Sequence, residues 1–329
     1  MLSYFARRLL LALVTIVFIS MLSFLIIHLP PGDYVDAYIA QLASSGAIVS
    51  AEEAANLRVQ YGLDQPIYIQ YLRWIGLITQ GNFGMAMEYN RPVIEVIGDR
   101  LPLTLVVSFA ALIFTWVLAL PIGIYSAVRQ YSIFDYLFTF IGFIGLAIPN
   151  FLLALTVLYL GFQFFNANIG GLFSPEYLDA PWSWGKVQDL LGHLGIPAVV
   201  LGVGATAQGI RIMRANLLDE KRKPYVVAAR ARGLTESEVI LKYPTRVALN
   251  PMASQIPFIL PQIVGGSIIV SVVLSLPTVG PLLLKALIAL DMFLAGTIIL
   301  LISVLTVIGS LISDLLLVWI DPRIRMERR

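Results

Sequence analysis

The sequence contains no cysteine, which excludes disulfides, thiolate metal sites and cysteine nucleophiles. Histidine is nearly absent as well, since the chain has only His28 and His193. Charged residues make up 13% of the chain, whereas an ordinary soluble protein carries about 25%. The net charge of +2 is too small to suggest nucleic-acid binding. These shortages argue against a soluble domain and against a metal centre.

Motifs that carry chemistry are also missing. The sequence has no G-x-x-x-x-G-K-[ST], so we do not expect ATP to bind this chain through a P-loop. It has no H-E-x-x-H and no G-x-S-x-G, and no paired carboxylates or activated nucleophile are visible. We therefore expect a chain that is not an enzyme and has no catalytic residues, metal or cofactor of its own.

Long hydrophobic runs are abundant. Hydrophobic residues make up 58% of the chain, the mean hydropathy is +0.85, and the charges are clustered between long neutral stretches. A helix needs about 20 apolar residues to cross a bilayer. The sequence thus predicts an all-α polytopic membrane protein with six transmembrane helices, at 9–29, 103–127, 136–164, 193–212, 254–276 and 293–319. The fifth region is interrupted by several prolines and can also be interpreted as a re-entrant segment.

The orientation follows from lysine and arginine. With a cytoplasmic N-terminus, 16 of the 22 basic residues lie in inner segments, nine of them between Arg211 and Arg246. Both termini are then cytoplasmic. Arg7 and Arg8 before an apolar run also resemble a signal peptide, but the run is longer than a signal-peptide core and no cleavage pattern follows it. We favour an uncleaved first span.

Two outer segments separate the spans. Residues 30–100 form a small extracytoplasmic domain, which is either a connecting loop or a lid and partner surface, and its length favours the lid. The second outer loop, 165–192, carries Trp182 and Trp184, which are typical of an interfacial aromatic belt rather than a ligand-stacking site. His28 and His193 lie near the same outer boundary and are interpreted as interfacial.

The inner segment 211–250 is polar and contains several residues that are typical of the beginnings and ends of helices. Pro224 suits a first helical position, and a short helix over 225–232 ends at Gly233, which suits a left-handed cap. Thr235 and Glu238 form a capping-box pattern that begins a second helix, expected to run from Glu236 to about Val247. Such a basic helix pair either docks a protein or lies on anionic lipid. DNA binding is less consistent with a pair tethered between two spans.

Residues 225–251, YVVAARARGLTESEVILKYPTRVALNP, resemble the cytoplasmic loop of ABC importer permeases of the oligopeptide and dipeptide family. Ala228, Ala229 and Gly233 match the general pattern E-A-A-x-x-x-G, although Val227 replaces its glutamate. Further segments resemble that family in order along the chain: Pro31-Gly32-Asp33, Gly62-Leu63-Asp64-Gln65-Pro66, Gln70-Tyr71-Leu72, Gly81-Asn82-Phe83-Gly84 and Asp321-Pro322-Arg323-Ile324-Arg325.

The resemblance implies a type I ABC importer permease fold in the bacterial inner membrane. It implies partners: a homologous second permease, two ATPase subunits that bind ATP and magnesium, and an extracytoplasmic substrate-binding protein. Peptides are the implied substrate, with oligosaccharides, nickel or opines as alternatives. The loop would be the coupling helix that contacts the ATPase, through Tyr225, Ala228, Ala229, Arg230, Arg232, Gly233 and Leu234.

The expected organisation is an N-terminus with the first span (1–29), the extracytoplasmic cap (30–100), a permease core of five further spans (101–320) containing the coupling loop 211–250, and a cytoplasmic tail (321–329). Uncharged polar residues in or beside spans should face the bundle or a water-filled pathway. The candidates are Asn150, Gln208, Gln255 and Gln262. A transporter driven by an ion gradient is a more remote alternative, because the one acid inside a span, Asp314, lies near its cytoplasmic end.

Overall fold

The computed structural model describes residues 2–44, 46, 49–165, 169–256, 258 and 268–320. The described chain is predominantly helical, and its one sheet is a two-stranded antiparallel hairpin of β1 (Met85–Ala86) and β2 (Arg91–Pro92). The chain divides into two compact units. The first contains Met1–Thr104 and Thr278–Leu305, and the second contains Leu105–Pro277 and Thr306–Arg329.

Within the described residues, four helical stretches are long and apolar enough to cross a membrane: Leu10–Ile27, Val93–Val128, Trp184–Glu220 and Met292–Leu317. They include α1 (Leu2–Ile27), α5 (Val93–Gly98), α6 (Leu101–Val128), α9 (Trp184–His193), α10 (Gly195–Glu220) and α18 (Met292–Ile320). These positions agree with the predicted spans at 9–29, 103–127, 193–212 and 293–319. However, α10 continues past the predicted end of its span to Glu220.

The predicted span 136–164 is wrong as a single straight helix. It consists of α7 (Ile133–Ala147) and α8 (Asn150–Phe165), which are bent by 98°. The break falls at Ile148 and Pro149. Ile148 is extended, with φ −81° and ψ 121°, because the ring of a following proline disfavours the helical conformation. If this bent pair counts as one span, the described residues contain five candidates.

The predicted span 254–276 falls in part outside the described residues, which lack 257 and 259–267. α14 (Asn250–Ala253) precedes it, and α16 (Ile268–Val273) lies within its second half. The next helix, α17 (Val279–Ile288), has ten residues and is too short to cross a bilayer.

The first unit has a core of its own. Helices α2 (Tyr34–Ser44), α3 (Ala51–Tyr61) and α4 (Ile67–Thr79) pack with the hairpin, α5, α17 and the start of α18. Fully buried Trp74, Leu282, Leu294 and Ile298 lie in this core. Gly62 adopts φ +70° and caps α3. Residues 30–100 are therefore an ordered fold that packs on α17, and not a simple connecting loop.

The carboxylate of Asp291 joins the hairpin region to α18. Its Oδ2 accepts a hydrogen bond from the backbone N–H of Met87 at 2.6 Å, and its Oδ1 accepts one from Leu294 at 3.0 Å. The side chain is fully buried. Burial raises the pKa of Asp291 to about 6, although the N–H groups of Leu294, Met87 and Glu88 oppose the rise.

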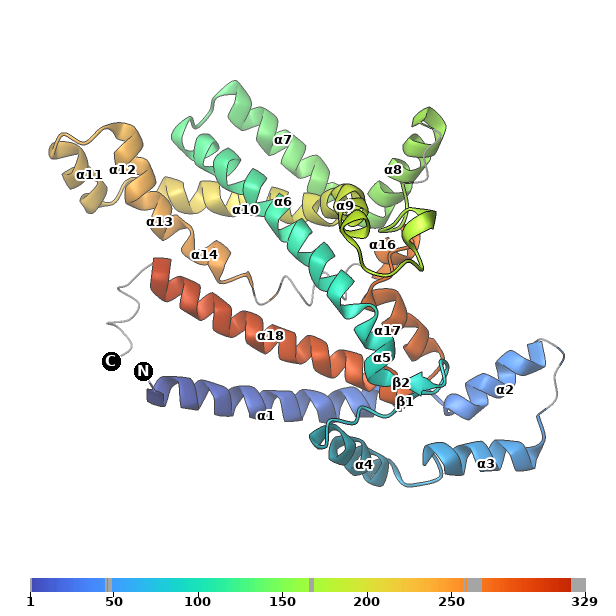
Figure 1. Ribbon diagram of the computed structural model, residues 1–329. Coiled ribbons are helices and arrows are strands. Elements are labelled where there is room, and N and C mark those ends of the chain that lie inside the picture. Colours follow the sequence, from blue (N-terminus) through green and yellow to red (C-terminus); the bar gives the residue numbers. More distant parts are fainter. Residues whose placement is uncertain are drawn as a thin grey trace. The chain divides into compact units, whose positions relative to one another are not determined.

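The second unit is built around α10. A Cβ added at Gly123 of α6 would meet the Met213 side chain at 2.7 Å, and one at Gly202 would meet Phe114 at 2.6 Å, so glycine lets α6 and α10 approach closely. α7 packs along another side of α10, where Gly145 lies against Val203. Figure 1 shows α9 at one end of α10 and several short helices at the other. The remaining elements of this unit are η1 (Pro175–Tyr177), α11 (Pro224–Ala231), α12 (Glu236–Lys242) and α13 (Pro244–Ala248).

Candidate functional site

The segment after α10 forms the helix pair that the sequence predicts. Lys223 is extended and Pro224 occupies the first turn of α11, where its missing N–H costs no helical hydrogen bond. The helix ends at Ala231, Arg232 is its C-cap residue, and Gly233 follows with φ +82°. A Cβ at Gly233 would meet no atom within 4 Å. The left-handed cap is thus confirmed, and it is the backbone conformation that requires glycine here.

The second helix begins as expected and ends early. Thr235 Oγ1 accepts from the N–H of Glu238, and Glu238 Oε2 accepts from the N–H of Thr235 at 3.0 Å, which confirms the capping box. The expected extension to Val247 is wrong, because α12 ends at Lys242 and Pro244 starts α13. Proline lacks the N–H that would continue the helix.

A small core holds α11 against α12. It consists of Val226, Ala229 and Val239, with Tyr225 and Leu234 partly buried around it. Ala229 is only 5% exposed. Among the predicted contact residues, Ala229, Tyr225 and Leu234 therefore support the helix pair from within.

The outer surface of the pair is formed mainly by α11. Ala228, Arg232 and Gly233 are exposed, as is Val227, which is 56% exposed. Val227 was not among the predicted contacts, because it stands where the general family pattern has a glutamate. Its position directly before Ala228 on the same short helix could have indicated that Val227 belongs to the contact surface. The pair thus presents small and apolar side chains beside basic ones.

Arg230 connects the two helices. Its Nε and Nη2 donate to the two carboxylate oxygens of Glu236 at 2.9 and 2.8 Å. These hydrogen bonds lower the pKa of Glu236, with smaller contributions from the charges of Arg230 and Lys221. Both side chains are more than a third exposed, so the pair fixes the geometry more than it stabilises the fold.

Two further bonds fix the end of α10, from which the pair begins: one joins its cap residue Lys221 to α6, and the other joins α11 to α10. Lys221 Nζ donates to the carbonyl of Ala127 in the last turn of α6 at 2.7 Å, and Tyr225 Oη donates to Glu220 at 2.7 Å. Burial lowers the pKa of Lys221, helped by the nearby Arg222 and Arg230. A hollow of about 250 Å³ opens beside these residues. It is lined by Val128, Lys221, Arg222, Val227, Arg230, Glu236 and Ile240. Sequence reasoning missed the bond from Lys221, because its acceptor is a backbone carbonyl 94 residues away.

The polar residues expected near a pathway gather partly on α10. Asn150, at the start of α8, lies against Gly204, where an added Cβ would be 3.8 Å from its Oδ1. Gln208 is exposed one turn further along α10. Gln255 is half-buried and follows Met252, whose side chain packs near Gly209. Gln262 lies outside the described residues.

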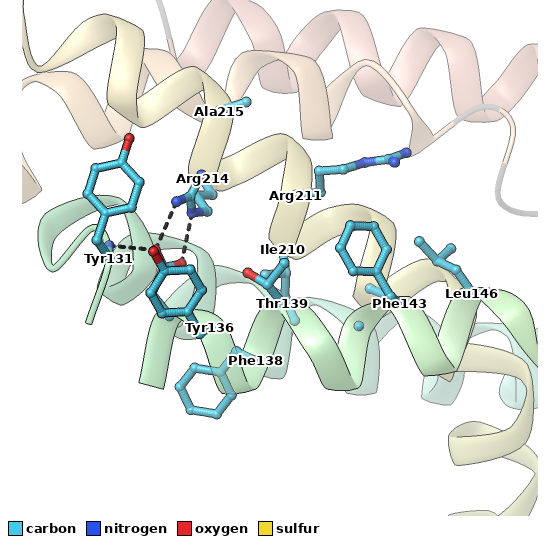
Figure 2. Close-up of a pocket in the computed structure, with 13 residues that line it drawn as sticks. Tyr131, Tyr136, Phe138, Thr139, Phe143, Leu146, Ile210, Arg211, Arg214 and Ala215 are labelled. Carbon is cyan, nitrogen blue, oxygen red and sulfur yellow. Dashed lines mark hydrogen bonds and ion pairs between the residues drawn. The ribbon is translucent and has the colours of Figure 1, made fainter. Parts of the chain in front are cut away.

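A groove runs between α7 and α10, and Figure 2 shows the side chains that line it. At one end, Arg214 donates from Nε and Nη2 to the two oxygens of Asp135, both at 2.8 Å. Asp135 also accepts from the N–H of Tyr131. The sequence analysis placed Arg211 and Arg214 in the inner loop, whereas both lie on α10.

The remaining polar residues singled out from the sequence have local partners. His28 Nδ1 lies 2.8 Å from the carbonyl of Phe24, and His193 Nδ1 lies 2.8 Å from that of Asp189. Trp182 is exposed and packs edge to face on Phe173. Asp314 is half-buried in α18.

Comparison with known proteins covers nearly the whole chain. Residues 119–326 match the model of the binding-protein-dependent transport system inner membrane component, and residues 1–108 match the model of its N-terminal part. The chain is 35% identical over 328 residues to a putative peptide permease protein of Brucella suis, covering 99% of this chain and 100% of that one. It is 34% identical over 328 residues to an oligopeptide transport system permease protein of Bacillus subtilis, covering 98% and 99%.

A dipeptide transport system permease protein of Escherichia coli is 29% identical over 344 residues, which cover both chains completely. The matches extend over both units and over the α11–α12 pair. Together with its long apolar helices, they make this chain a multi-pass protein of the inner membrane. It belongs to the family of binding-protein-dependent transport system inner membrane components.

Proposed function

We propose that this chain is a permease subunit of an ATP-driven importer, and that it forms a translocation pathway for peptides together with a second, homologous permease. The family supports the importer, and the relatives named as peptide, oligopeptide and dipeptide permeases support the substrate. Nothing in the described part of the fold favours oligosaccharides, nickel or opines over peptides.

The proposed topology has six spans, with both termini in the cytoplasm. The four long helical stretches and the bent pair α7–α8 supply five of them, and residues 254–276 supply the other. Residues 30–100 then lie outside as a cap, and α11 and α12 lie in the cytoplasm. The distribution of basic residues supports this orientation.

The α11–α12 pair is the proposed docking element for the ATPase subunits, which would bind ATP and magnesium. Ala228, Arg230, Arg232 and Gly233, together with Val227, would form the contact surface, while Tyr225, Ala229 and Leu234 keep its shape. The bonds from Lys221 to α6 and from Tyr225 to α10 are the means by which movement of the ATPases would reach the spans.

The cap, residues 30–100, is the proposed surface for the extracytoplasmic binding protein or a lid over the pathway. Its packing on α17 supports either role, because an ordered cap keeps a fixed shape. Substrate choice would then be shared between the binding protein and the pathway.

The observation that carries the proposal is the exposed, doubly capped helix pair attached to α6 and α10. The test is reconstitution of the chain with its partner permease, ATPases and binding protein in liposomes. Uptake of labelled trialanine should require ATP. Uptake that proceeds without the ATPases under a proton gradient contradicts the proposal, and so does uptake of nickel or a maltooligosaccharide in place of trialanine.

A further inference from the structure

One side of α10 is exposed and carries three polar residues and two alanines. Its residues are Ala205, Gln208, Arg211, Ala215 and Asp219, whose spacing of three or four places them along one face of the helix. We call this face the polar stripe. The exposed residues of α7 and α8 are instead mostly apolar, for example Phe140, Ile144 and Leu155, with Thr156 and Gln163 of α8 as exceptions.

The difference between the polar stripe of α10 and the mostly apolar exposed residues of α7 and α8 indicates that they contact different surroundings. Hydrocarbon offers no hydrogen bonds, so helix faces that contact lipid are apolar, as is the face of α7 that carries Phe140 and Ile144 and does not line the groove. Polar and ionisable groups within spans face a water-filled cavity or the interior of a bundle. The polar stripe, with Gln208 deeper in the helix than Arg211, therefore belongs to a wall that contacts water.

Arg211 is the cation of the polar stripe. It is exposed, and it forms no ion pair within the described parts of the chain. Arg214, one turn nearer the cytoplasmic end, is neutralised by the paired oxygens of Asp135, which is 2% exposed. The positive charge of Arg211 is thus left uncompensated beside a neutral ion pair.

A groove of suitable size adjoins this charge. Its volume is about 310 Å³, at the lower end of the range of about 300–1,000 Å³ found for small-molecule sites. Arg211 and Arg214 extend from α10 on one side, and Tyr136, Phe143 and Leu146 of α7 lie on the other (Figure 2). A cation beside an apolar wall suits a small solute that carries a carboxylate and an apolar side chain.

We infer that Arg211 and this groove form a binding site for the carboxylate of the transported solute, in the cytoplasmic half of the pathway. The guanidinium has a fork of N–H donors that matches a carboxylate. A terminal carboxylate is common to peptides of every sequence, so this contact would hold any of them. The inference rests on the proposed function and adds to it one contact, between Arg211 and the terminal carboxylate of the peptide.

The test uses the reconstituted complex and labelled trialanine as the probe. Arg211→Gln removes the charge and should lower uptake about tenfold, since a hydrogen bond to a charged group is lost. Arg211→Lys keeps the charge and should retain most of the uptake. Arg129→Gln is the matched control, because Arg129 is exposed near the same end of α7 but does not line the groove.

Chemical rescue separates loss of charge from loss of fold. The chain has no cysteine, so Arg211→Cys provides a single thiol in this subunit. Its uptake should be low, should recover after treatment with the cationic ethylammonium methanethiosulfonate, and should stay low after treatment with the anionic ethylsulfonate reagent. The complex with the unmodified chain, treated in the same way, controls for cysteines in the partners.

Each outcome bears on the inference. Full uptake by Arg211→Gln, or equal rescue by both reagents, overturns the carboxylate site and leaves the peptide importer intact. A thiol at 211 that reacts only with a lipid-soluble maleimide places Arg211 against lipid and also overturns it. Failure of the unmodified complex to take up trialanine refutes the proposed function instead.

Discussion

Gly233 is a position where the backbone alone limits substitution. Its φ is +82°, and a Cβ added there would meet only open space. Gly233→Val places a β-branched residue in a left-handed conformation. The resulting strain of roughly 1–2 kcal/mol shifts the equilibrium between the formed cap and the unwound cap about tenfold toward the unwound cap. We expect the spans to insert normally and ATP hydrolysis to continue, while the amount of peptide imported per ATP falls.

The control is Gly233→Asn. Asparagine adopts the left-handed conformation more readily than other non-glycine residues, so this variant should retain coupling. Peptide uptake and phosphate release are measured on the same liposomes. Normal coupling in the valine variant would show that the cap does not transmit the movement of the ATPase.

Asp291 gives the first unit a dependence on pH. Its pKa is raised to about 6 in the folded protein, above the value of about 3.9 for an unfolded chain. The folded state therefore binds the proton more tightly, and its advantage is complete below about pH 4. It is lost as the pH rises through 6, at a cost on the order of 2–3 kcal/mol. The melting temperature of the purified protein should be higher at pH 5 than at pH 7.5.

Asp291→Asn should abolish this difference. The amide also presents an N–H₂ group where the carboxylate has an acceptor, opposite a backbone N–H of Met87 or Leu294. The variant should therefore melt at a lower temperature at both pH values. If it keeps the pH dependence of the parent protein, another group is responsible for the effect.

At the scale of elements, Lys221 joins the end of α10, from which the docking pair begins, to α6. Its ammonium donates to the carbonyl of Ala127, one of the last carbonyls of α6 that has no helical partner. Lys221→Met keeps most of the side-chain volume and loses the bond. We expect uptake to fall several-fold, with unchanged binding of the ATPases in a pull-down, because a bond of about 1–3 kcal/mol is removed.

Lys223→Met is the matched control. Lys223 is exposed, and its side chain forms no hydrogen bond to the described residues. This variant should transport normally. Equal losses in the two variants would assign the effect to the general loss of basic charge and not to the contact with α6.

Local patterns predicted the features that depend on neighbouring residues. The cap at Gly233 and the box formed by Thr235 and Glu238 were predicted, because the interacting groups lie within a few positions. The length of α10 was not predicted. Arg211 indicated the end of the span near residue 212, yet α10 continues to Glu220, and the charge of Arg214 within it is paired with Asp135, 79 residues away. The bend at Pro149 was also missed, because proline is tolerated inside apolar helices, as Pro121 in α6 shows.

At the scale of the whole molecule, α17 indicates how the chain crosses the membrane after the docking pair. Leu282 and Ala286 of α17 lie in the same core as Val35, Trp74 and Val93 of residues 30–100. In the proposed topology those residues are outside, whereas α11 and α12 are inside. The chain between Ala248 and Thr278 must then cross the membrane an odd number of times, which favours a full span over a re-entrant loop.

Single cysteines test this crossing, because the chain has none of its own. Asp64→Cys and Lys285→Cys are at exposed positions and should react with an impermeant maleimide on intact cells. Ser237→Cys, exposed on α12, should react only after the membrane is opened. If Lys285→Cys behaves like Ser237→Cys, residues 254–276 form a re-entrant segment. α17 would then lie on the cytoplasmic side, and since it shares a core with residues 30–100, the external position of the cap would have to be abandoned with it.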